Sequence, residues 1–315
     1  MSELKICFIG IGSIAKRHMK NLDYICQKNQ VDLSLDVCRS KYGASLEPPY
    51  KDLVHAVYYG TENLPEGYDV IFITNPTKYH FATLEAVAKK AKHFFIEKPV
   101  FDRTEVDWEK IRTAKGSICY VACPLRYSGV IQYLKSHVDF RHIYSIRSIS
   151  SSYLPEWRKG VDYRETYSAH KESGGGVAID LIHEWDYLTY LFGFPQKVYT
   201  LQGKYSELEI DSEDLAVYIA AYKDKCVELH LDYFGRETVR KIELIGRDDT
   251  IVGDLVANEI FFLKEGKKIS FDEKRDDYQI RELVSFLAMV QGTEKNGNDI
   301  KKACEVLKLA RGEFL

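Results

Sequence analysis

The stretch that decides the fold is Leu-Lys-Ile-Cys-Phe-Ile-Gly-Ile-Gly-Ser-Ile-Ala, residues 4–15. Its first half, Leu4 to Ile9, is a short apolar run of the kind that forms buried strands. Apolar residues continue beyond the glycines at helical spacing, at Ile14, Met19 and Leu22. The sequence therefore predicts a strand, a glycine turn and a helix at the start of an α/β fold.

The spacing G-x-G-x-x-A in this turn suits a dinucleotide. Gly10 permits the tight turn, Gly12 lets the backbone approach a pyrophosphate, and Ala15 lets the helix pack closely on the strand. The N–H groups at the helix N-terminus can then bind the phosphates. A glycine turn without a ligand is the alternative. Because the G-x-G-x-x-A motif stands directly after the first strand, we favour a dinucleotide-binding Rossmann domain.

The end of the second predicted strand, Leu33–Cys38, bears on the choice of cofactor. NAD sites usually have an acidic residue there for the ribose 2′-hydroxyl, whereas a 2′-phosphate requires a cation. Here the strand is followed by Arg39 and Ser40, and Asp36 lies within the strand. We therefore predict NADP, with Arg39 and Ser40 at its phosphate end. NAD is the alternative, in which Arg39 is a solvated loop residue.

Further strands are predicted at 68–74, 93–96 and 117–122. The first is followed by Asn75-Pro76-Thr77 and the second by Glu97-Lys98-Pro99. Because a parallel α/β sheet binds ligands at the carboxyl ends of its strands, both turns are candidate binding loops. The alternation of strands with helices predicts a doubly wound parallel sheet.

The composition excludes several classes of protein. The chain has 315 residues, of which 45% are hydrophobic, enough for two domains with buried cores. A net charge of −3 gives no basic excess of the kind that binds nucleic acid or anionic membranes. Seven scattered cysteines without a C-x-x-C pair argue against a disulfide framework or a metal site, and they predict a cytoplasmic protein. No apolar run reaches the ~20 residues of a membrane span, so we expect no signal peptide and no anchor.

The second half of the chain has a different character. Short alternating segments separated by turns predict an antiparallel sheet. They lie at 145–152, 197–205, 215–222, 226–234, 239–246, 250–255 and 260–263. We expect Val217, Ile219 and Leu229 on the face that packs on helices, and Tyr218 and His230 on the other, which forms an oligomer surface or a solvated face. Helical spacing at 276–291 and 298–312 predicts two terminal helices that pack back on the structure.

A second glycine-rich stretch, Gly174-Gly175-Gly176, opens an apolar segment that carries Asp180, His183, Glu184 and Asp186. Consecutive glycines cost conformational entropy and are used where the backbone must approach something closely. Charged groups among apolar residues are costly unless they are paired. The segment predicts either a site at the start of a helix or an ordinary amphipathic helix with a polar face.

Four motifs, in this order and at these separations, resemble the Gfo/Idh/MocA family (glucose–fructose oxidoreductase, inositol dehydrogenase and rhizopine catabolism proteins). They are the glycine turn, Asn-Pro-Thr-x-x-His at 75–80, Glu-Lys-Pro at 97–99 and Gly-Gly-Gly-x-x-x-Asp at 174–180. The resemblance covers nearly the whole chain. It implies a Rossmann domain over residues 1–122. Over residues 123–315 it implies a substrate-binding α/β domain whose open, mostly antiparallel sheet mediates a homodimer or homotetramer.

The resemblance also implies activity and cofactor contacts. Members are usually NAD(P)-dependent dehydrogenases or reductases of sugars, cyclitols and sugar nucleotides. In relatives the peptide before the residue matching Pro99 is often cis, and the lysine matching Lys98 lies near both nicotinamide and substrate. The implied cofactor contacts are Gly10, Gly12, Ser13, Ile14, Thr74, Asn75, Pro76, Thr77, His80, Glu97, Lys98 and Arg126.

The chemistry of a dehydrogenase requires a base for the hydroxyl proton and a cation for the charge that develops on oxygen. Lys98 suits the second task. The family commonly places its histidine four residues after the aspartate, whereas His183 follows Asp180 by three. On a continuous helix both His183 and Glu184 lie on the face of Asp180, so spacing leaves both open as the base. We favour His183, because imidazole titrates near neutral pH, with Asp180 orienting it or binding the substrate hydroxyl.

In relatives the segment before the triple glycine lines the substrate pocket. Here it contains Trp157, Arg158, Tyr163 and Arg164, and aromatic faces and guanidinium groups suit an acidic or phosphorylated sugar derivative, including a nucleotide-linked one. Glu184 is a further candidate contact with the substrate. A loop whose charges pair with each other is the alternative. The sequence thus predicts an NAD(P)-dependent oxidoreductase acting on a CH–OH group of a sugar, with Lys98 and His183 as the catalytic pair. A catalytically inactive cofactor-binding sensor is the alternative.

Overall fold

The computed structural model describes residues 3–40 and 46–314. The chain divides into two compact units. The first combines Met1–Ala122 with Arg275–Cys304, and the second combines Cys123–Lys274 with Glu305–Leu315. The distinct roles expected of residues 1–122 and 123–315 stay a prediction.

The first unit is built on a six-stranded parallel sheet in the order β3-β2-β1-β4-β5-β6. Its strands are β1 (Glu3–Ile9), β2 (Asp32–Arg39), β3 (Val54–Tyr59), β4 (Tyr68–Ile73), β5 (Ala91–Ile96) and β6 (Cys119–Val121). The chain reverses its direction of winding at β1, which pairs with β2 on one side and β4 on the other. This is the point where a doubly wound sheet opens a crevice for a ligand. The predicted Rossmann-type sheet is confirmed.

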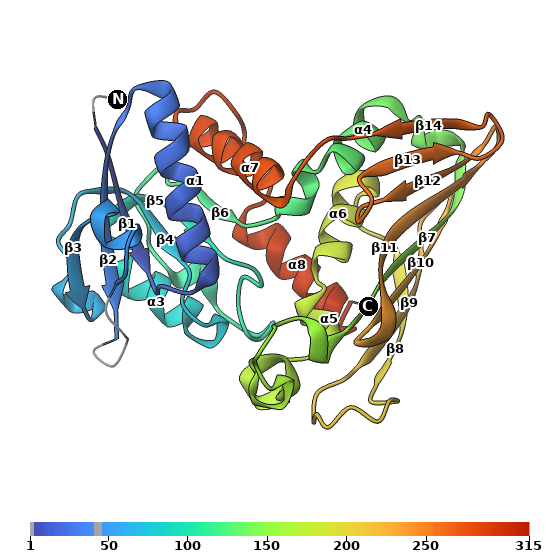
Figure 1. The fold of residues 1–315 in the computed structure, drawn as a ribbon, viewed down its shortest axis with the longest axis horizontal. Helices are drawn as coiled ribbons and strands as arrows, with labels where there is room; N and C mark the ends of the chain where they lie inside the picture. The colour runs from blue at the N-terminus through green and yellow to red at the C-terminus, as the bar shows by residue number, and fades with distance from the viewer. Residues whose placement is uncertain (1–2, 41–45, 315) are drawn as a thin grey trace. The chain divides into compact units, whose positions relative to one another are not determined.

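Helices that bury residues in this unit include α1 (Ser13–Asn29), α3 (His80–Val87) and α7 (Arg275–Val290). The short helix α2 (Tyr50–Leu53) precedes β3, and its residues are exposed or half-buried. Helices α1 and α7 lie side by side although the sequence separates them widely (Figure 1). Phe286 of α7 packs on Phe72 and Phe95, at ring-centroid distances of 6.0 and 5.2 Å. A C-terminal helix therefore completes the core of the N-terminal sheet.

The second unit is built on an eight-stranded sheet in the order β14-β13-β12-β11-β7-β10-β9-β8. Neighbouring strands are antiparallel except for β7 and β10, which pair in parallel. The strands are β7 (Ile143–Tyr153), β8 (Lys197–Gly203), β9 (Leu215–Ala221), β10 (Cys226–Asp232), β11 (Phe234–Gly246), β12 (Thr250–Asp254), β13 (Glu259–Phe262) and β14 (Lys267–Ser270). The predicted open, mostly antiparallel sheet is confirmed.

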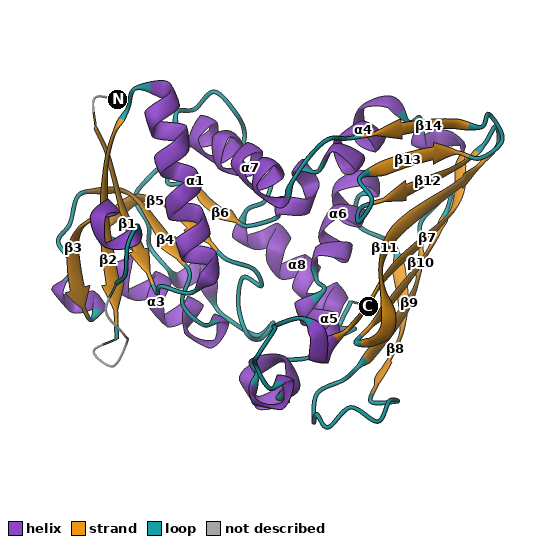
Figure 2. Ribbon diagram, viewed as in Figure 1, coloured by secondary structure: helices purple, strands orange, loops and turns teal. Residues whose placement is uncertain are grey.

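Helices α4 (Gly129–His137), α5 (Val177–Asp180) and α6 (His183–Phe192) lie on one face of this sheet (Figure 2). The last helix of the chain is α8 (Ile300–Arg311). Short 3-10 turns connect the main elements. They are η1 (Thr61–Asn63), η2 (Thr77–Tyr79), η3 (Trp108–Lys110), η4 (Pro124–Tyr127), η5 (Phe140–His142), η6 (Leu154–Glu156), η7 (Tyr163–Glu165), η8 (Tyr167–Ala169) and η9 (Lys171–Ser173).

The predicted faces of β9 were wrong. The register pairs Leu229 with Tyr218 and His230 with Val217, so Tyr218 shares the face of Leu229. Tyr218 is 1% exposed and packs edge-on against Trp185 of α6, whereas Ile219 is 49% exposed. Apolar residues occupy both faces of this strand, and reading the alternation one residue out reverses every assignment. The outward face carries Ile219 and, on neighbouring β8, the exposed Tyr199 and Leu201.

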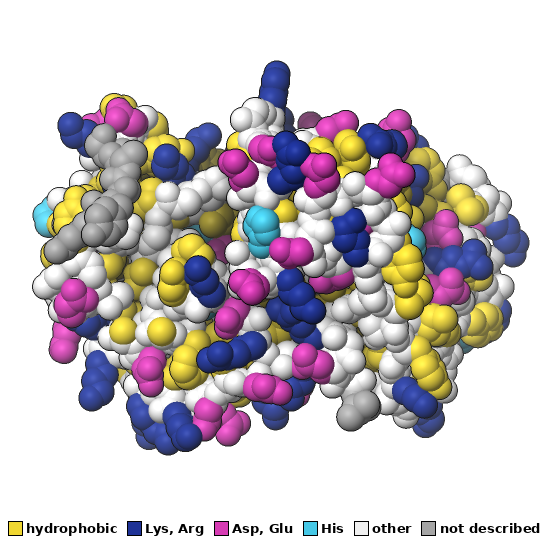
Figure 3. All heavy atoms as spheres, turned by 90° about the horizontal axis from the view of Figure 1, so that it is seen from below, with side chains coloured by type: hydrophobic (Ala, Val, Ile, Leu, Met, Phe, Trp, Pro, Cys, Tyr) yellow, Lys and Arg dark blue, Asp and Glu magenta, His cyan; other side chains and the backbone are white. Residues whose placement is uncertain are grey.

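The surface mixes charges of both signs. Over the face in Figure 3, lysine and arginine side chains are interspersed with aspartate and glutamate. Within residues 3–40 and 46–314, no helix is long and apolar enough to cross a membrane. The same residues contain no cluster of three or more His, Cys, Asp and Glu side chains that could hold a metal ion.

Candidate functional site

The glycine turn between β1 and α1 is held tightly against the end of β4. Gly10 has a φ of +90°, and a Cβ there would lie 2.7 Å from Cα of Asn75. The hydroxyl of Thr74 donates to the carbonyl oxygens of Ile9 and Gly10, at 3.0 and 2.9 Å. Glycine is therefore required at residue 10, both for its backbone conformation and for this close approach.

Gly12 is open on its outer side. A Cβ built there would have no atom within 4 Å, and Gly12 is the N-cap of α1 without any side-chain cap. No acidic residue occupies the first turn of the helix, Ser13 is exposed and Ile14 is half-buried. An uncapped helix N-terminus beside a residue without a side chain fits a pyrophosphate.

The loop after β4 contains a buried acceptor without a partner. Asn75 donates its Nδ2 to Oγ1 of Thr83 at 2.8 Å, while its Oδ1 is buried and has no hydrogen-bond partner. Such atoms are rare in native proteins and often mark a functional site. In the following turn Pro76 is exposed and Thr77 is half-buried. This loop thus fits the polar edge of a nucleoside.

His80 is buried and connects two candidate binding loops. Its Nε2 lies 2.9 Å from the carbonyl oxygen of Asn75, and its Nδ1 lies 3.1 Å from that of Pro99. Burial acts to lower the pKa of His80, and the hydrogen bonds to these carbonyl oxygens oppose the shift without cancelling it. Its contacts indicate that His80 holds the two loops together, and a direct contact with a cofactor stays a prediction.

Glu97 and Lys98 follow β5 at the carboxyl edge of the sheet. Glu97 Oε1 lies 2.6 Å from Nε2 of His18, and Oε2 accepts a hydrogen bond from the backbone N–H of Lys98 at 3.3 Å. Burial alone would raise the pKa of Glu97, but the His18 hydrogen bond and the nearby positive charge of Lys98 outweigh it and lower the pKa. Lys98 is half-buried, and its peptide bond to Pro99 is cis, as the resemblance implies.

The end of β2 carries the cation Arg39, whereas Asp36 lies within the strand. Arg39 is half-buried at the last position of the strand, and Ser40 after it is exposed. Asp36 is buried and accepts a hydrogen bond of 2.7 Å from the hydroxyl of Tyr68, with Nδ1 of His55 at 3.3 Å. Its carboxylate is engaged inside the sheet. It does not stand at the strand end, where an NAD site places an acid.

In the second unit Arg126 forms a buried, bidentate ion pair. Its Nε and Nη2 donate to the two carboxylate oxygens of Asp186, at 2.8 and 2.7 Å. The guanidinium also lies over the ring of Tyr190, with its centroid at 5.2 Å. The pair fastens η4 to α6, and the expected contact of Arg126 with the cofactor stays a prediction.

The segment after the triple glycine is not one continuous helix. Helix α5 ends at Asp180 and α6 begins at His183, with Leu181 between them at φ −98° and ψ 27°. The argument that Asp180, His183 and Glu184 share one helical face is therefore wrong. Gly175 explains the tight entry to this segment, because a Cβ there would clash with the carbonyl oxygens of Tyr167 and Ser168.

Asp180 is held by two tyrosine hydroxyls that sequence reasoning missed. Tyr167 donates to Oδ1 at 2.5 Å and Tyr233 donates to Oδ2 at 2.6 Å. Burial, followed by the charge of Asp180, raises the pKa of both phenols, so they stay protonated as donors. We call Tyr167, Asp180 and Tyr233 the tyrosine clamp. No local sequence signal links these residues, since Tyr233 comes from the turn between β10 and β11.

Glu184 and His183 have different surroundings. Glu184 is 0% exposed, and its Oε1 lies 2.7 Å from Nε of Arg240 on β11. Burial raises the pKa of Glu184, and the charge of Arg240 opposes the shift. His183 is half-buried at the first position of α6. Glu184 thus has a structural partner where a substrate contact was predicted. The role of His183 as the base stays a prediction.

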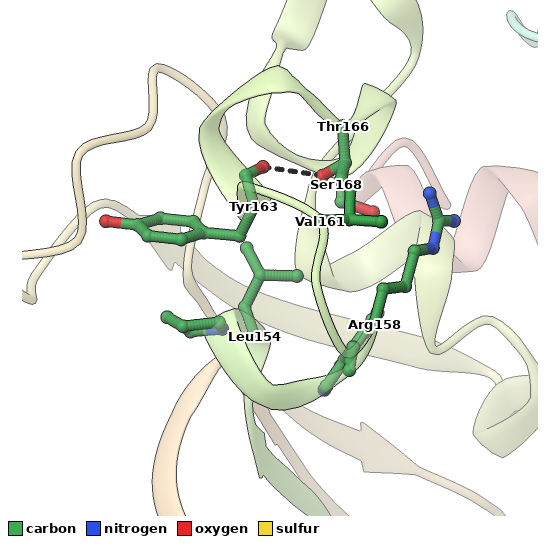
Figure 4. A pocket seen from close by; sticks show the side chains of 8 residues that line it. Leu154, Arg158, Val161, Tyr163, Thr166 and Ser168 are labelled. Atoms are coloured by element: carbon green, nitrogen blue, oxygen red, sulfur yellow. Dashed lines mark hydrogen bonds between the residues drawn. The ribbon is translucent and has the colours of Figure 1, made fainter.

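The coil between β7 and α5 encloses a small pocket with ≈ 210 Å³ of empty space, open to solvent (Figure 4). It is lined by Leu154, Pro155, Trp157, Arg158, Val161, Tyr163, Thr166 and Ser168. Three of the five predicted substrate contacts, Trp157, Arg158 and Tyr163, are in this set. Arg164 is absent from it and pairs with Asp162 and Glu209, at 2.7 and 2.6 Å. Arg164 therefore pairs with neighbouring carboxylates, as the alternative to a substrate contact predicted.

The pocket is connected to the tyrosine clamp. Trp157 packs edge-on against Tyr233 at 5.2 Å between ring centroids, and the guanidinium of Arg158 lies 5.5 Å from the ring centroid of Tyr167. Part of the ≈ 210 Å³ is open solvent, so the enclosed space is well below the roughly 300 Å³ at which small-molecule pockets begin. The pocket can therefore hold one substituent of a larger ligand beside Asp180.

Comparison with known families identifies both halves of the chain. Residues 4–121 match the oxidoreductase family with an NAD-binding Rossmann fold, and residues 138–310 match the C-terminal alpha/beta domain of the same family. The chain belongs to the Gfo/Idh/MocA oxidoreductase family. The glycine turn and the Glu97–Lys98 loop thus belong to the NAD-binding part of a Gfo/Idh/MocA protein.

Known relatives of this Gfo/Idh/MocA protein include sugar dehydrogenases. A D-xylose dehydrogenase of Paenarthrobacter nicotinovorans is 30% identical over 141 residues, which span 43% of this chain and 36% of that protein. The chain therefore matches little more than a third of the length of this curated relative.

Solved structures share the fold at low sequence identity. UDP-N-acetylglucosamine 3-dehydrogenase from Acidithiobacillus ferrooxidans superposes with a TM-score of 0.79 at 19% identity, covering 99% of this chain and 97% of that one. A dehydrogenase from Bordetella pertussis, solved with NADH and UDP-GlcNAcA, gives 0.77 at 17% identity, with 99% and 96% covered. Levoglucosan dehydrogenase with NADH and levoglucosan gives 0.83 at 16% identity, with 99% and 97% covered.

Proposed function

We propose that this protein is an NAD(P)-dependent oxidoreductase that moves a hydride to or from a hydroxyl-bearing carbon of a sugar derivative. The observation that carries the proposal lies in the first unit. There, an uncapped helix N-terminus after a glycine turn, a buried orphan acceptor on Asn75, and the Glu97–Lys98 loop meet at the carboxyl edge of one parallel sheet. This is the edge at which such sheets bind dinucleotides. The sugar dehydrogenases among its relatives support the class of substrate.

Each candidate residue has a task that its chemistry suits. The bound nicotinamide supplies the hydride acceptor or donor. The ammonium group of Lys98 stabilises the negative charge that develops on the substrate oxygen, and His183 accepts the hydroxyl proton. Asp180, held by two phenol donors, binds a substrate hydroxyl or orients the base. Glu97 accepts hydrogen bonds from a ribose of the cofactor.

We propose NADP as the preferred cofactor, with NAD as the alternative. Arg39 and Ser40 follow the end of β2, where a 2′-phosphate requires a cation, and Asp36 is engaged by Tyr68. Differential thermal shift measures the preference, because the tighter ligand stabilises the protein more at equal concentration. NADP should give the larger shift, and Arg39→Gln should remove the difference. A larger shift with NAD, unchanged in Arg39→Gln, would contradict the assignment.

We propose an acidic or nucleotide-linked sugar derivative as substrate, because Arg158, Trp157 and Tyr163 line one pocket beside the tyrosine clamp. The structurally similar UDP-N-acetylglucosamine 3-dehydrogenase and the Bordetella pertussis dehydrogenase solved with UDP-GlcNAcA support the same class. The outward face of the eight-stranded sheet, with exposed Tyr199, Leu201 and Ile219, supports a homodimer or homotetramer. The scattered cysteines support a cytoplasmic location.

The test is a substrate screen with the wild-type protein. Free sugars, sugar acids, cyclitols and nucleotide sugars are each incubated with NAD and NADP, and reduced nicotinamide is followed by absorbance. We expect turnover with at least one acidic or nucleotide-linked sugar. Cofactor binding without turnover over the whole panel would instead favour the inactive sensor.

A further inference from the structure

His18 is a buried histidine of α1 that has no role in the proposed reaction. It is 1% exposed and lies against the rings of Phe72 in β4 and Phe95 in β5, at centroid distances of 5.8 and 5.0 Å. An imidazole in such an aromatic environment is costly unless its polar atoms are used. Its Nε2 lies 2.6 Å from Oε1 of Glu97.

The direction of this hydrogen bond follows from the partner. Glu97 has a lowered pKa and is ionised at neutral pH, so its oxygen can only accept. Nε2 therefore carries a proton and donates it, whichever state Nδ1 has. Nδ1 is buried and has no hydrogen-bond partner, so the bond to Glu97 is the polar contact that this ring provides. A short bond to an ionised acceptor is among the stronger hydrogen bonds in proteins.

The bond fixes the carboxylate at the carboxyl end of β5. Oε1 is held by His18 and Oε2 by the backbone N–H of Lys98, so both ends of the carboxylate have a donor. Each carboxylate oxygen can accept more than one hydrogen bond. Glu97 can thus receive ribose hydroxyls while its plane stays fixed, and this removes an ordering cost that the cofactor would otherwise have to supply.

The position of His18 on α1 also connects two parts of the cofactor site. Ser13 begins the helix at the glycine turn, and His18 follows five residues later, which is about 7.5 Å along the helix axis. Helix α1 therefore offers its N-terminus to the pyrophosphate and the side chain of His18 to Glu97, the residue proposed to bind the ribose. A helix shift that moved one contact would move the other.

We propose that His18 is the positioning residue that holds Glu97 in the orientation in which it accepts hydrogen bonds from the cofactor ribose. This inference rests on the proposed function, because it assumes a nicotinamide dinucleotide. His18 touches Glu97 and not the reacting atoms, so its removal should weaken cofactor binding and raise the cofactor KM while leaving kcat at saturation nearly unchanged.

Two substitutions of the same chemistry and different reach test the role. The amide nitrogen of glutamine can take the place of Nε2, whereas that of asparagine is closer to the place of Nδ1. The Kd values of NADH and NADPH are measured by fluorescence titration of the full-length protein. We expect His18→Asn to raise the Kd of the tighter cofactor about tenfold, which is the loss of one hydrogen bond to a charged group, and His18→Gln to stay within about threefold of wild type.

Asn21 supplies the matched control. It lies on the same helix, is 3% exposed and makes no hydrogen bond to Glu97. Asn21→Ala should change the apo melting temperature without changing the cofactor Kd. If His18→Asn does not fold, His18→Phe preserves an aromatic ring beside Phe72 and Phe95, removes the donor, and should give the same increase in Kd. In a Glu97→Gln background, either loss-of-donor variant should have no further effect, because the role acts through Glu97.

The outcomes separate this inference from the proposed function. Equal Kd values for wild type and the loss-of-donor variants would overturn the role of His18 and leave the proposed function standing. Equal weakening by His18→Asn and His18→Gln, or additive effects of His18 and Glu97 substitutions, would also overturn it. A wild-type protein that binds neither NADH nor NADPH would overturn both.

Discussion

The half-buried carboxylate of Glu97 and the buried carboxylate of Glu184 have opposite pKa shifts because their partners differ. At Glu97 burial acts to raise the pKa, but the hydrogen bond from His18 and the contacts with Lys98 together outweigh it and lower the pKa. At Glu184 burial dominates over the charge of Arg240, and the pKa is raised. The two residues should therefore respond to pH in opposite directions.

For Glu97 the shift predicts a loss of stability in acid. A folded-state pKa below the unfolded value means that the stabilisation is present above the unfolded pKa and is lost as the pH falls through the folded pKa. The melting temperature of the apo protein should therefore drop below about pH 4.5, the ordinary value of a glutamate. The melting temperature of the Glu97→Gln variant should drop less between pH 7 and pH 4. Parallel melting curves for the two proteins between pH 7 and pH 4 would contradict the pairing with His18.

For Glu184 the structure predicts a severe effect of losing Arg240. Arg240→Leu leaves a carboxylate buried without its charged partner, which should cost about 3 kcal/mol in the free energy of unfolding at pH 7. Because the folded-state pKa is raised, stability is lost as the pH rises through it, so the deficit should shrink as the pH is lowered toward 5. Urea unfolding at both pH values measures this. The double variant Arg240→Leu/Glu184→Leu, which removes the charge, should recover much of the stability, and no recovery would argue against the ion pair.

Sequence patterns identified individual site residues only where they fall in contiguous motifs. The glycine turn and Glu97-Lys98-Pro99 follow strands directly, so their place at the sheet edge could be predicted. His18, Tyr167, Tyr233 and Arg240 reach their partners through tertiary packing. His18 and Glu97 are 79 residues apart, and Tyr233 and Asp180 are 53 apart. A single sequence contains no signal for such pairs.

At the scale of elements, the glycine turn after β1 could be predicted from the sequence, whereas the break between α5 and α6 could not. The turn was predicted because its spacing matches a known strand–turn–helix unit. The break at Leu181 was not, because the apolar periodicity of residues 177–192 continues through it. Strands β3 and β14 were also missed, and both are short strands at the edge of a sheet. Residues of β3 alternate between half-buried and exposed, and most residues of β14 are exposed.

Gly10 and Gly12 should respond differently to the same substitution. Gly12→Ala adds a methyl group to open space and keeps an ordinary backbone conformation, so the melting temperature should change little. The same methyl group lies where the pyrophosphate approaches, so cofactor affinity should fall at least about tenfold. Gly10→Ala places Cβ against the backbone of Asn75 at a positive φ and should lower both stability and affinity.

Thermal melting of both apo proteins and titration with NADH and NADPH distinguish these effects. Normal cofactor affinity in Gly12→Ala would mean that the open side of the turn does not receive the pyrophosphate. A melting temperature of Gly10→Ala equal to that of wild type would contradict the close approach to Asn75.

At the scale of the molecule, the order of strands and helices predicted the doubly wound sheet of the first unit, and turn-separated alternating segments predicted the open sheet of the second. Two features could not be predicted. The joining of α7 to the first unit depends on packing of Phe286 on Phe72 and Phe95, which no local pattern encodes. The faces of β9 depend on its register with β10, and apolar residues on both sides of the strand left the register undetermined.

We propose that Lys98 acts together with a bound nicotinamide in the oxidation or reduction of a sugar derivative. Lys92 on β5 provides a matched control, because it is an exposed lysine of the same strand that pairs with Asp69 at 2.8 Å. Lys92→Met should leave turnover unchanged. His183→Ala should lower kcat about a hundredfold if His183 is the base.

The most direct measurement is kcat for Lys98→Met on the substrate found by screening, together with the Kd of its cofactor. We expect kcat to fall about a hundredfold or more, a much larger factor than any rise in the cofactor Kd. Turnover of Lys98→Met close to that of wild type and of Lys92→Met would contradict this expectation.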